Sequence, residues 1–394
     1  MSAAVCAARR ASSHRCRLGA LLAAGLLASC AGTGVAPVVD PAPAVCATPP
    51  ALSARGSARP IPGFPGLATQ RFLGDVLADS ANWEVAQWQA WLARARALAL
   101  ADGTSQAGMP VDDACVRFWL AQNSPRQRRL LRAGAMVESE YSTAQRALGA
   151  YPLTAIGLRM GISLYQRDTL RQWREAAQRD DPASGLRGDL QRFVIADAPA
   201  GTAPNITAAQ LAAAPRDALG IPVISAPLAA QLAAAFAPQW AMAVAGTADR
   251  PGRPRLTPQL GVDSSRPILS WRVDFTRVHD QILPQISWVL WFDGRPPQGA
   301  LDSYAGALDG VVWRTTFAAD GWPRIHDTIH ACGCYHMVFP VRHAPLAVAE
   351  GLYEERRLQP GGRVGAAALA LLIDSTTHYV RAVVPADAAQ DYPA

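Results

Sequence analysis

This sequence contains no lysine, and its 37 basic residues are all arginine. Together with abundant alanine, proline and glycine, this absence is typical of a coding bias and excludes no class of function. Other absences are more informative. The chain has no Gly-x-Ser-x-Gly elbow, no phosphate-binding loop and no dinucleotide fingerprint, which disfavours the enzyme classes built on those motifs. Beyond residue 28 it also has no uninterrupted apolar run long enough to span a bilayer.

The first thirty residues have the layout of a secretory leader. Arginines at positions 9, 10, 15 and 17 precede an apolar stretch from Leu18 to Ala28. That stretch is too short for a transmembrane helix but suits the hydrophobic region of a signal peptide. It ends in Leu-Ala-Ser-Cys30, which resembles the lipobox of bacterial lipoproteins. The resemblance implies cleavage before Cys30 and a diacylglycerol on its sulfur. The alternative is an ordinary signal peptide in which Cys30 is coincidental.

The lipoprotein resemblance also implies a location. Ala31 follows the cysteine, where lipoproteins held at the inner membrane usually carry Asp. We therefore expect the bacterial cell envelope, outer membrane, with the protein facing the periplasm and anchored by the lipid on Cys30. Removing the four leader arginines leaves 33 basic against 31 acidic residues. A balance so close to neutral indicates no nucleic-acid partner, and the sequence names no protein partner.

Periodicity predicts an α+β fold with a helical N-terminal half and a β-rich, mainly antiparallel C-terminal half. Polar capping residues followed by helical spacing predict helix starts at Ser80, at Asp112 or Asp113, and at Ser124. We expect four stretches: a signal peptide (1–29), a Pro/Ala/Gly-rich tether (30–66), a helical region (67–240) and a β-rich region (265–385).

Strands are predicted where β-branched and aromatic residues concentrate. Asp293-Gly294 is expected to end one strand in a turn, and Asp320-Gly321 to close a hairpin. The absence of βαβ alternation argues against a doubly wound nucleotide-binding fold. The expected strands cover residues 268–275, 285–292, 311–317 and 369–384, the last interrupted at 375–378.

One segment concentrates side chains that bind metals or perform thiol chemistry. Within eleven residues the chain places His326, His330, Cys332, Cys334 and His336, although it has only seven histidines and seven cysteines in all. If the segment is extended, all five share one face by parity. Gly333 could instead let the chain turn sharply around a common centre.

Three hypotheses explain this cluster. Thiolate and imidazole together are ligands for zinc or copper, so four of the five residues could hold a structural or catalytic metal, with His330, Cys332 and His336 as ligands of a metal-dependent hydrolase. Alternatively, Cys332 and Cys334 form a strained, redox-active disulfide in the oxidising envelope. In the third, the histidines are hydrogen-bonded core residues and the protein is a non-catalytic envelope binding or assembly factor. The sequence leaves open whether this is an enzyme.

Nearby polar residues could support the site. Asp327 is the candidate catalytic residue, as a general base or as a group that orients a histidine, although a strand-edge Asp is an equally simple interpretation. Asp302, Asp309 and Arg314 would lie beside the cluster if the preceding hairpin folds over it, or else serve only as turn and surface residues. Elsewhere, Cys46 and Cys115 could form a disulfide, one of three connectivities that four cysteines allow.

Overall fold

The computed structural model describes a defined part of the chain: residues 44–46, 58–100, 113–137, 163–193, 203–255, 260–297, 299, 302, 305–341, 357–360 and 363–389, except 165, 177, 180 and 279. The predicted leader, Cys30 and most of the predicted tether lie outside these residues. Contacts group residues 41–394 into one unit. Within the described part, no helix is both long and apolar enough to cross a membrane.

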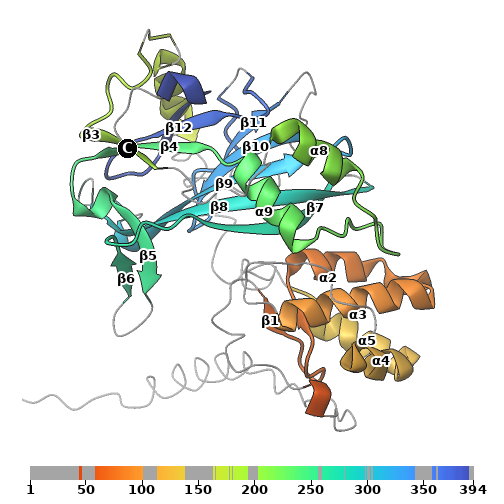
Figure 1. The fold of residues 1–394 in the computed structure, drawn as a ribbon. Coiled ribbons are helices and arrows are strands. Elements are labelled where there is room, and N and C mark those ends of the chain that lie inside the picture. Colours follow the sequence, from red (N-terminus) through yellow and green to blue (C-terminus); the bar gives the residue numbers. More distant parts are fainter. Residues whose placement is uncertain are drawn as a thin grey trace, which may run out of the picture. The chain divides into compact units, whose positions relative to one another are not determined.

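Short helices dominate the first part of the described chain (Figure 1). The capping signals predicted two of their starts correctly. Asp113 accepts hydrogen bonds from the backbone N–H groups of Cys115 and Val116, and Ser124 forms a capping box with Gln127. The helices are α2 (Arg71–Ala78), α3 (Val85–Leu100), α4 (Ala114–Ala121), α5 (Pro125–Ala135), α8 (Pro204–Ala212) and α9 (Ala226–Ala235).

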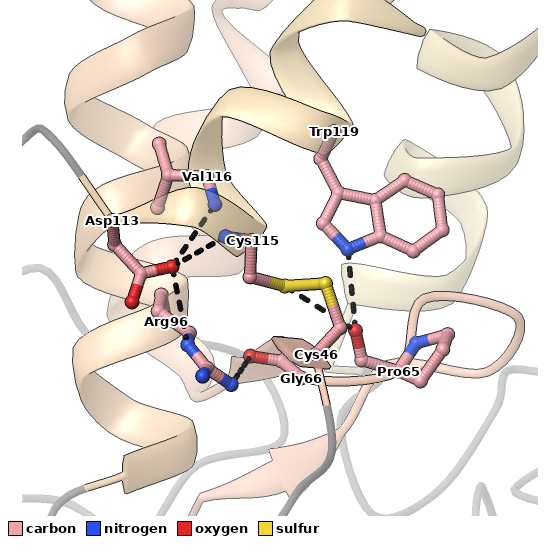
Figure 2. Close-up of a disulfide and its surroundings, with 8 residues drawn as sticks. All are labelled: Cys46, Pro65, Gly66, Arg96, Asp113, Cys115, Val116 and Trp119. Carbon is pink, nitrogen blue, oxygen red and sulfur yellow. Dashed lines mark hydrogen bonds and ion pairs between the residues drawn. A yellow bond between two sulfur atoms is a disulfide. The ribbon is translucent and has the colours of Figure 1, made fainter. Parts of the chain in front are cut away.

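A disulfide between Cys46 and Cys115 fastens the short 3-10 turn Ala44–Cys46 to the start of α4 (Figure 2). Two backbone carbonyls beside the bridge are also held. The indole N–H of Trp119 donates to the carbonyl oxygen of Pro65 at 3.2 Å, and the Arg96 guanidinium donates to that of Gly66 at 3.3 Å. These contacts join segments that the sequence separates widely.

The predicted tether boundary at residue 66 falls inside an ordered element. Strand β1 (Arg59–Pro60) pairs antiparallel with β2 (Ala68–Thr69). Ile61 and Phe64, in the turn between them, are both buried. Burying these apolar side chains explains why the chain is already folded here despite its proline and glycine content.

Most later strands build a seven-stranded antiparallel sheet in the order β11-β10-β9-β8-β5-β6, with β7 paired beside β5 on β8. Strand β8 continues through Asp293-Gly294 to Arg295, so the turn predicted there is wrong: Gly294 pairs with Ala307 of β9, and Arg295 pairs with Gly306. The predicted hairpin turn at Asp320-Gly321 is confirmed, with Gly321 at φ +77°. The strands are β5 (Pro251–Arg255), β6 (Gly261–Asp263), β7 (Ser270–Val278), β8 (Gln281–Arg295), β9 (Gly306–Phe317), β10 (Pro323–His330) and β11 (Met337–Pro340).

A second sheet has the order β13-β12-β4-β3. Strand β12 runs parallel to β4, and the other two pairings are antiparallel. Strand β3 lies inside the stretch predicted to be helical, and β4 begins in its last two residues. Neither was predicted, because alternation in these short segments is weak beside the alanine-rich helices around them. The strands are β3 (Asp189–Phe193), β4 (Gln239–Val244), β12 (Leu369–Ile373) and β13 (Val380–Pro385).

The two faces of the large sheet have different chemistry. On the inner face Trp288 of β8 pairs with Trp313 of β9, and both are fully buried in the main hydrophobic core. Helices α8 and α9 and strands β4 and β12 contribute to that same core. The outer face carries polar side chains, among them Gln285, Ser287 and Arg314. The fold is therefore α+β, as predicted, with a mainly antiparallel C-terminal half.

Candidate functional site

The His/Cys segment forms a β-hairpin. Strand β10 pairs antiparallel with β11, with His326 opposite Phe339 and Thr328 opposite Met337. The turn between them is closed by hydrogen bonds from the His330 N–H to the Cys334 carbonyl and from the Gly333 N–H to the His330 carbonyl. Because the chain reverses after His330, strand parity stops there, and the expectation that all five side chains share one face is wrong.

Glycine is needed in this turn for its backbone freedom. Gly333 has φ +90°, a conformation that side chains strongly disfavour, although no heavy atom lies within 4 Å of where its Cβ would be. Tyr335 also adopts a positive φ, +58°. The alternative considered for Gly333, a sharp turn, is what the structure shows.

His326 is a core histidine on the inner face of the sheet. Its Nδ1 lies 2.8 Å from the Thr315 hydroxyl and its Nε2 lies 3.2 Å from the Gly365 carbonyl oxygen. The ring stacks on Trp313 with centroids 5.3 Å apart. Burial lowers the pKa of His326 to about 4, so the imidazole is neutral. Both ring nitrogens are engaged, which matches the structural interpretation of this residue.

His336 lies with Asp327 and Arg314. Its Nε2 is 3.1 Å from Asp327 Oδ1, and Arg314 Nε donates to the same oxygen at 2.8 Å. Asp327 follows His326 in β10, so its side chain takes the outer face by alternation. Burial raises the pKa of Asp327, but the Arg314 guanidinium and His336 outweigh it, and the pKa is lowered overall. Asp327 is thus a paired carboxylate that orients His336.

His330 enters a buried ionic network, which we call the Asp–His network: His330, Asp309, His378 and Asp249. Nδ1 of His330 lies 3.3 Å from Asp309 Oδ1, and the other Asp309 oxygen lies 2.7 Å from Nδ1 of His378. His378 Nε2 is 3.3 Å from Asp249 Oδ1, within ion-pair distance but not aligned as a hydrogen bond. Four ionisable side chains therefore form a continuous chain.

The Asp–His network joins the two sheets. Asp309 belongs to β9 in the large sheet, whereas His378 lies in the turn between β12 and β13 of the small one. Asp249 ends the 3-10 turn η5 (Thr247–Asp249), between β4 and β5, and accepts N–H groups from Ala245 and Gly246. It also accepts the N–H of Thr376 at 2.5 Å. Thr376 and His378 both have positive φ, at +66° and +53°.

Electrostatics in this network favour the charged forms. For His378, burial lowers the pKa, but hydrogen bonding and attraction to Asp249 and Asp309 outweigh it and raise the pKa above its ordinary value. Burial likewise opposes ionisation of Asp249, yet His378 and three backbone N–H donors bring its pKa down to about 2. The pKa of Asp309 is lowered in the same way by its two histidines. The two carboxylates on either side of His378 thus favour its protonated form.

Cys332 and Cys334 lie in the turn and are not disulfide-bonded; Cys332 is exposed and Cys334 is half-buried. A hydrogen bond from the Cys334 side chain is the main influence on Cys332. A backbone hydrogen bond from Cys334 and the nearby His330 act in the same direction, and together they lower the pKa of the Cys332 thiol to about 6. Behind the turn, Tyr335 stacks on Tyr379 at 3.7 Å between ring centroids.

The five clustered residues thus occupy three separate settings: His326 in the core, His336 with Asp327 on the outer face, and His330 with the two thiols at the turn. Among the residues that the structure describes, no three His, Cys, Asp or Glu side chains gather to hold a metal ion. His330 Nε2 is buried and has no hydrogen-bond partner there.

Sequence reasoning placed Asp309 and Arg314 beside the cluster, but it missed Asp249 and His378. One feature of the sequence pointed to His378: the polar run Ser-Thr-Thr-His interrupts an apolar strand. Asp249 had no such feature, because it lies 129 residues from His378 and nothing in its local sequence indicates a distant partner. Asp302, the third of these polar residues, has a carboxylate oxygen 3.9 Å from the Arg295 guanidinium.

Comparison with protein-family models, curated proteins and solved structures found no match to this chain. The function is therefore argued from the geometry of the site alone.

Proposed function

We propose that this chain is an envelope lipoprotein that performs thiol–disulfide exchange with Cys332 and Cys334. The observation that carries the proposal is the placement of two cysteines that are not disulfide-bonded, with one residue between them, in a turn that both strands of a hairpin hold in position. Cys332 is exposed to a reaction partner, and Cys334 lies within hydrogen-bonding reach of it. This is the arrangement of an attacking thiol with a resolving thiol.

The exchange reaction balances with a disulfide as the second reactant. The Cys332 thiolate attacks one sulfur of a substrate disulfide, and the other substrate sulfur leaves as a thiolate that takes up a proton. The Cys334 thiol then loses its proton and attacks Cys332 in the mixed disulfide, which releases the second substrate thiol. The substrate gains two electrons and two protons, and the protein is left with a Cys332–Cys334 disulfide. The reverse sequence oxidises a dithiol.

Neighbouring side chains support this chemistry. His330, whose Nδ1 lies 3.3 Å from Asp309, acts to lower the pKa of the Cys332 thiol, whereas Asp309 itself acts to raise it. The disulfide between Cys46 and Cys115 is consistent with an oxidising compartment. A zinc or copper site at the same thiols is the competing hypothesis, with His330 Nε2 as the donor that the structure leaves unpartnered within its described part.

We expect alkylation of Cys332 by iodoacetamide to follow a pH profile with its midpoint near 6, in the full-length protein extracted with detergent. Cys334→Ala should move that midpoint upward, because the variant loses the hydrogen bond that stabilises the thiolate. Equilibration with glutathione buffers, followed by mass spectrometry, should show reversible formation of a Cys332–Cys334 disulfide in the wild type alone.

Two outcomes would contradict thiol exchange at Cys332 and Cys334. A midpoint near that of an ordinary thiol, about 8.5, and the same in wild type and Cys334→Ala, would remove the basis of the redox proposal. Stoichiometric zinc or copper in protein prepared without chelators, lost in a Cys332→Ser/Cys334→Ser variant, would favour the metal hypothesis instead. Cys46 and Cys115 serve as internal controls, since their bridge is not expected to exchange under the same buffers.

The membrane anchor is tested separately. Cys30→Ser should move the protein from the membrane to the soluble fraction, because the proposed lipid is attached through that sulfur. Cys6→Ser, a matched change within the leader, should leave fractionation unaltered. Cell fractionation with immunoblotting measures both. Membrane association that persists in the Cys30→Ser variant would contradict the lipoprotein proposal.

A further inference from the structure

A cavity of about 670 Å³ lies between the first turns of α2 and the outer face of β7, β8 and β9. Two contacts hold α2 at this face: the rings of Phe72 and Phe275 are 5.8 Å apart, and Asp79 pairs with Arg277. The cavity is separate from the turn that carries Cys332 and Cys334, and neither cysteine lines it.

Positive charge dominates the cavity wall. It is lined by two aspartates, Asp75 and Asp274, and by five arginines at positions 59, 71, 272, 277 and 314. Three of these arginines are neutralised locally: Arg272 pairs with Asp274 at 2.6 Å, Arg277 with Asp79, and Arg314 with Asp327. Within the described part of the chain, the other two, Arg59 and Arg71, are not neutralised in this way.

Arg59 and Arg71 have no carboxylate within ion-pair distance among the residues that the structure describes. Asp75 lies one helical turn after Arg71, but the two do not pair. Arg71 is also the first residue of α2, whose first turn contains no acidic residue and whose N-cap, Gln70, makes no side-chain capping bond. The positive end of the helix dipole therefore adds to two unpaired guanidinium groups at one edge of the cavity.

Apolar surface lies beside this charge. Phe72, Val76 and Phe275 also line the cavity. A ligand that fits both features carries a phosphate or carboxylate for the arginines and a hydrocarbon portion for the aromatic side chains. Guanidinium groups suit such anions because their fork of N–H donors matches two anionic oxygens.

We propose that this cavity binds an amphipathic anion, with a phosphate or carboxylate group held by Arg59 and Arg71 and an apolar portion packed on Phe72 and Phe275. The anionic group could belong to a free small molecule or to a lipid headgroup, and the two sources share this chemistry. This binding site is independent of thiol exchange at Cys332.

The test is titration calorimetry on the full-length, detergent-extracted protein, with octyl phosphate as the amphipathic anion and inorganic phosphate as its polar counterpart. We expect saturable binding of octyl phosphate, weakened at least about tenfold by Arg59→Ala/Arg71→Ala, since the double variant loses both charged hydrogen-bond donors. Inorganic phosphate should bind more weakly. Raising the salt concentration should weaken both.

Arg126→Ala is the matched control, since Arg126 is an exposed arginine in the first turn of another helix, α5. It should leave octyl phosphate binding unchanged, and thermal unfolding of each variant reports whether it has folded. Co-flotation of the Cys30→Ser protein with phosphatidylglycerol vesicles, reduced by the double variant, would identify a lipid headgroup as the source. No saturable binding to any of these probes, or equal weakening by Arg126→Ala, would overturn the proposal.

Discussion

Replacing His378 with alanine is expected to lower the free energy of unfolding by about 3–5 kcal/mol, the usual cost of breaking a buried ion pair. The ring is fully buried and stacks on Phe292 with centroids 4.0 Å apart. Its removal leaves the carboxylates of Asp249 and Asp309 without the imidazole that pairs with both. It also opens a cavity beside Phe292, which adds to the loss. Urea unfolding followed by tryptophan fluorescence measures the change.

His336→Ala is the matched control for this prediction. It also removes a histidine from a buried carboxylate, but Asp327 keeps its guanidinium partner Arg314. We expect a loss of about 1 kcal/mol or less. Asp309→Asn combined with His378→Ala should cost less than the sum of the single changes, because the two groups interact directly. Equal losses in the His378 and His336 variants would show that the network has no special role in stability.

The same network predicts a pH dependence. The pKa of His378 is higher in the native state than in the unfolded state, where it is about 6.5. The contribution of His378 to the unfolding free energy is therefore complete below about pH 6.5 and is lost as the pH rises through the native pKa. The lowered pKa of Asp249 means that its contribution is complete above about 3.9 and is lost as the pH falls towards about 2. The difference in unfolding free energy between wild type and His378→Ala should therefore be largest between about pH 4 and 6.5.

Loss of the Cys46–Cys115 disulfide should lower the free energy of unfolding nearly as much as His378→Ala does. The two cysteines are 69 residues apart in sequence, and the loop-entropy relation gives about 4 kcal/mol for closing a loop of that length. A Cys46→Ser/Cys115→Ser variant should unfold at correspondingly lower urea concentration. Both cysteines are buried, so the serine hydroxyls add a desolvation cost of their own. The effect should centre on the helical part, where the bridge joins α4 to the segment before β1.

Reduction of the wild type separates these two causes. It opens the bridge without introducing hydroxyls, so the reduced wild type should lie between the oxidised wild type and the variant. Cys332→Ser/Cys334→Ser removes two cysteines that are not bridged and should change the unfolding free energy by under about 1 kcal/mol. If the bridge variant unfolds like the wild type, the loop-entropy argument does not apply to this chain.

Local signals predicted much of this fold because the physics behind them is local. The cap at Ser124 and the turn at Gly321 depend on residues within a few positions of each other, and the structure contains both. The turn predicted at Asp293-Gly294 is wrong for the opposite reason. The turn propensity of this dipeptide is overridden by the pairing of Gly294 with Ala307 of β9, a residue beyond the few positions that a local signal covers. The small sheet was missed in part for the same reason, since β4 pairs in parallel with β12 about 130 residues later.

The sequence predicted where in the chain the candidate site lies, but not which side chains contact one another there. Parity correctly gives His326 and His330 the same face of β10, and it fails at Cys332 because a turn has no alternation. Nothing local indicates that His336 meets Asp327 whereas His330 meets Asp309. The first contact depends on the register of β10 against β11 and the second on its register against β9, and the tertiary fold sets both.

The backbone around the thiol turn has an energetic consequence of its own. Tyr335, Thr376 and His378 are three of the five non-glycine residues with positive φ in the described part of the chain, and all three flank the Tyr335–Tyr379 stack or the Asp–His network. An L-residue in that left-handed region costs about 1–2 kcal/mol, and more when it is β-branched as threonine is. Both turns are therefore held in strained backbone conformations that the contacts of the surrounding fold must stabilise.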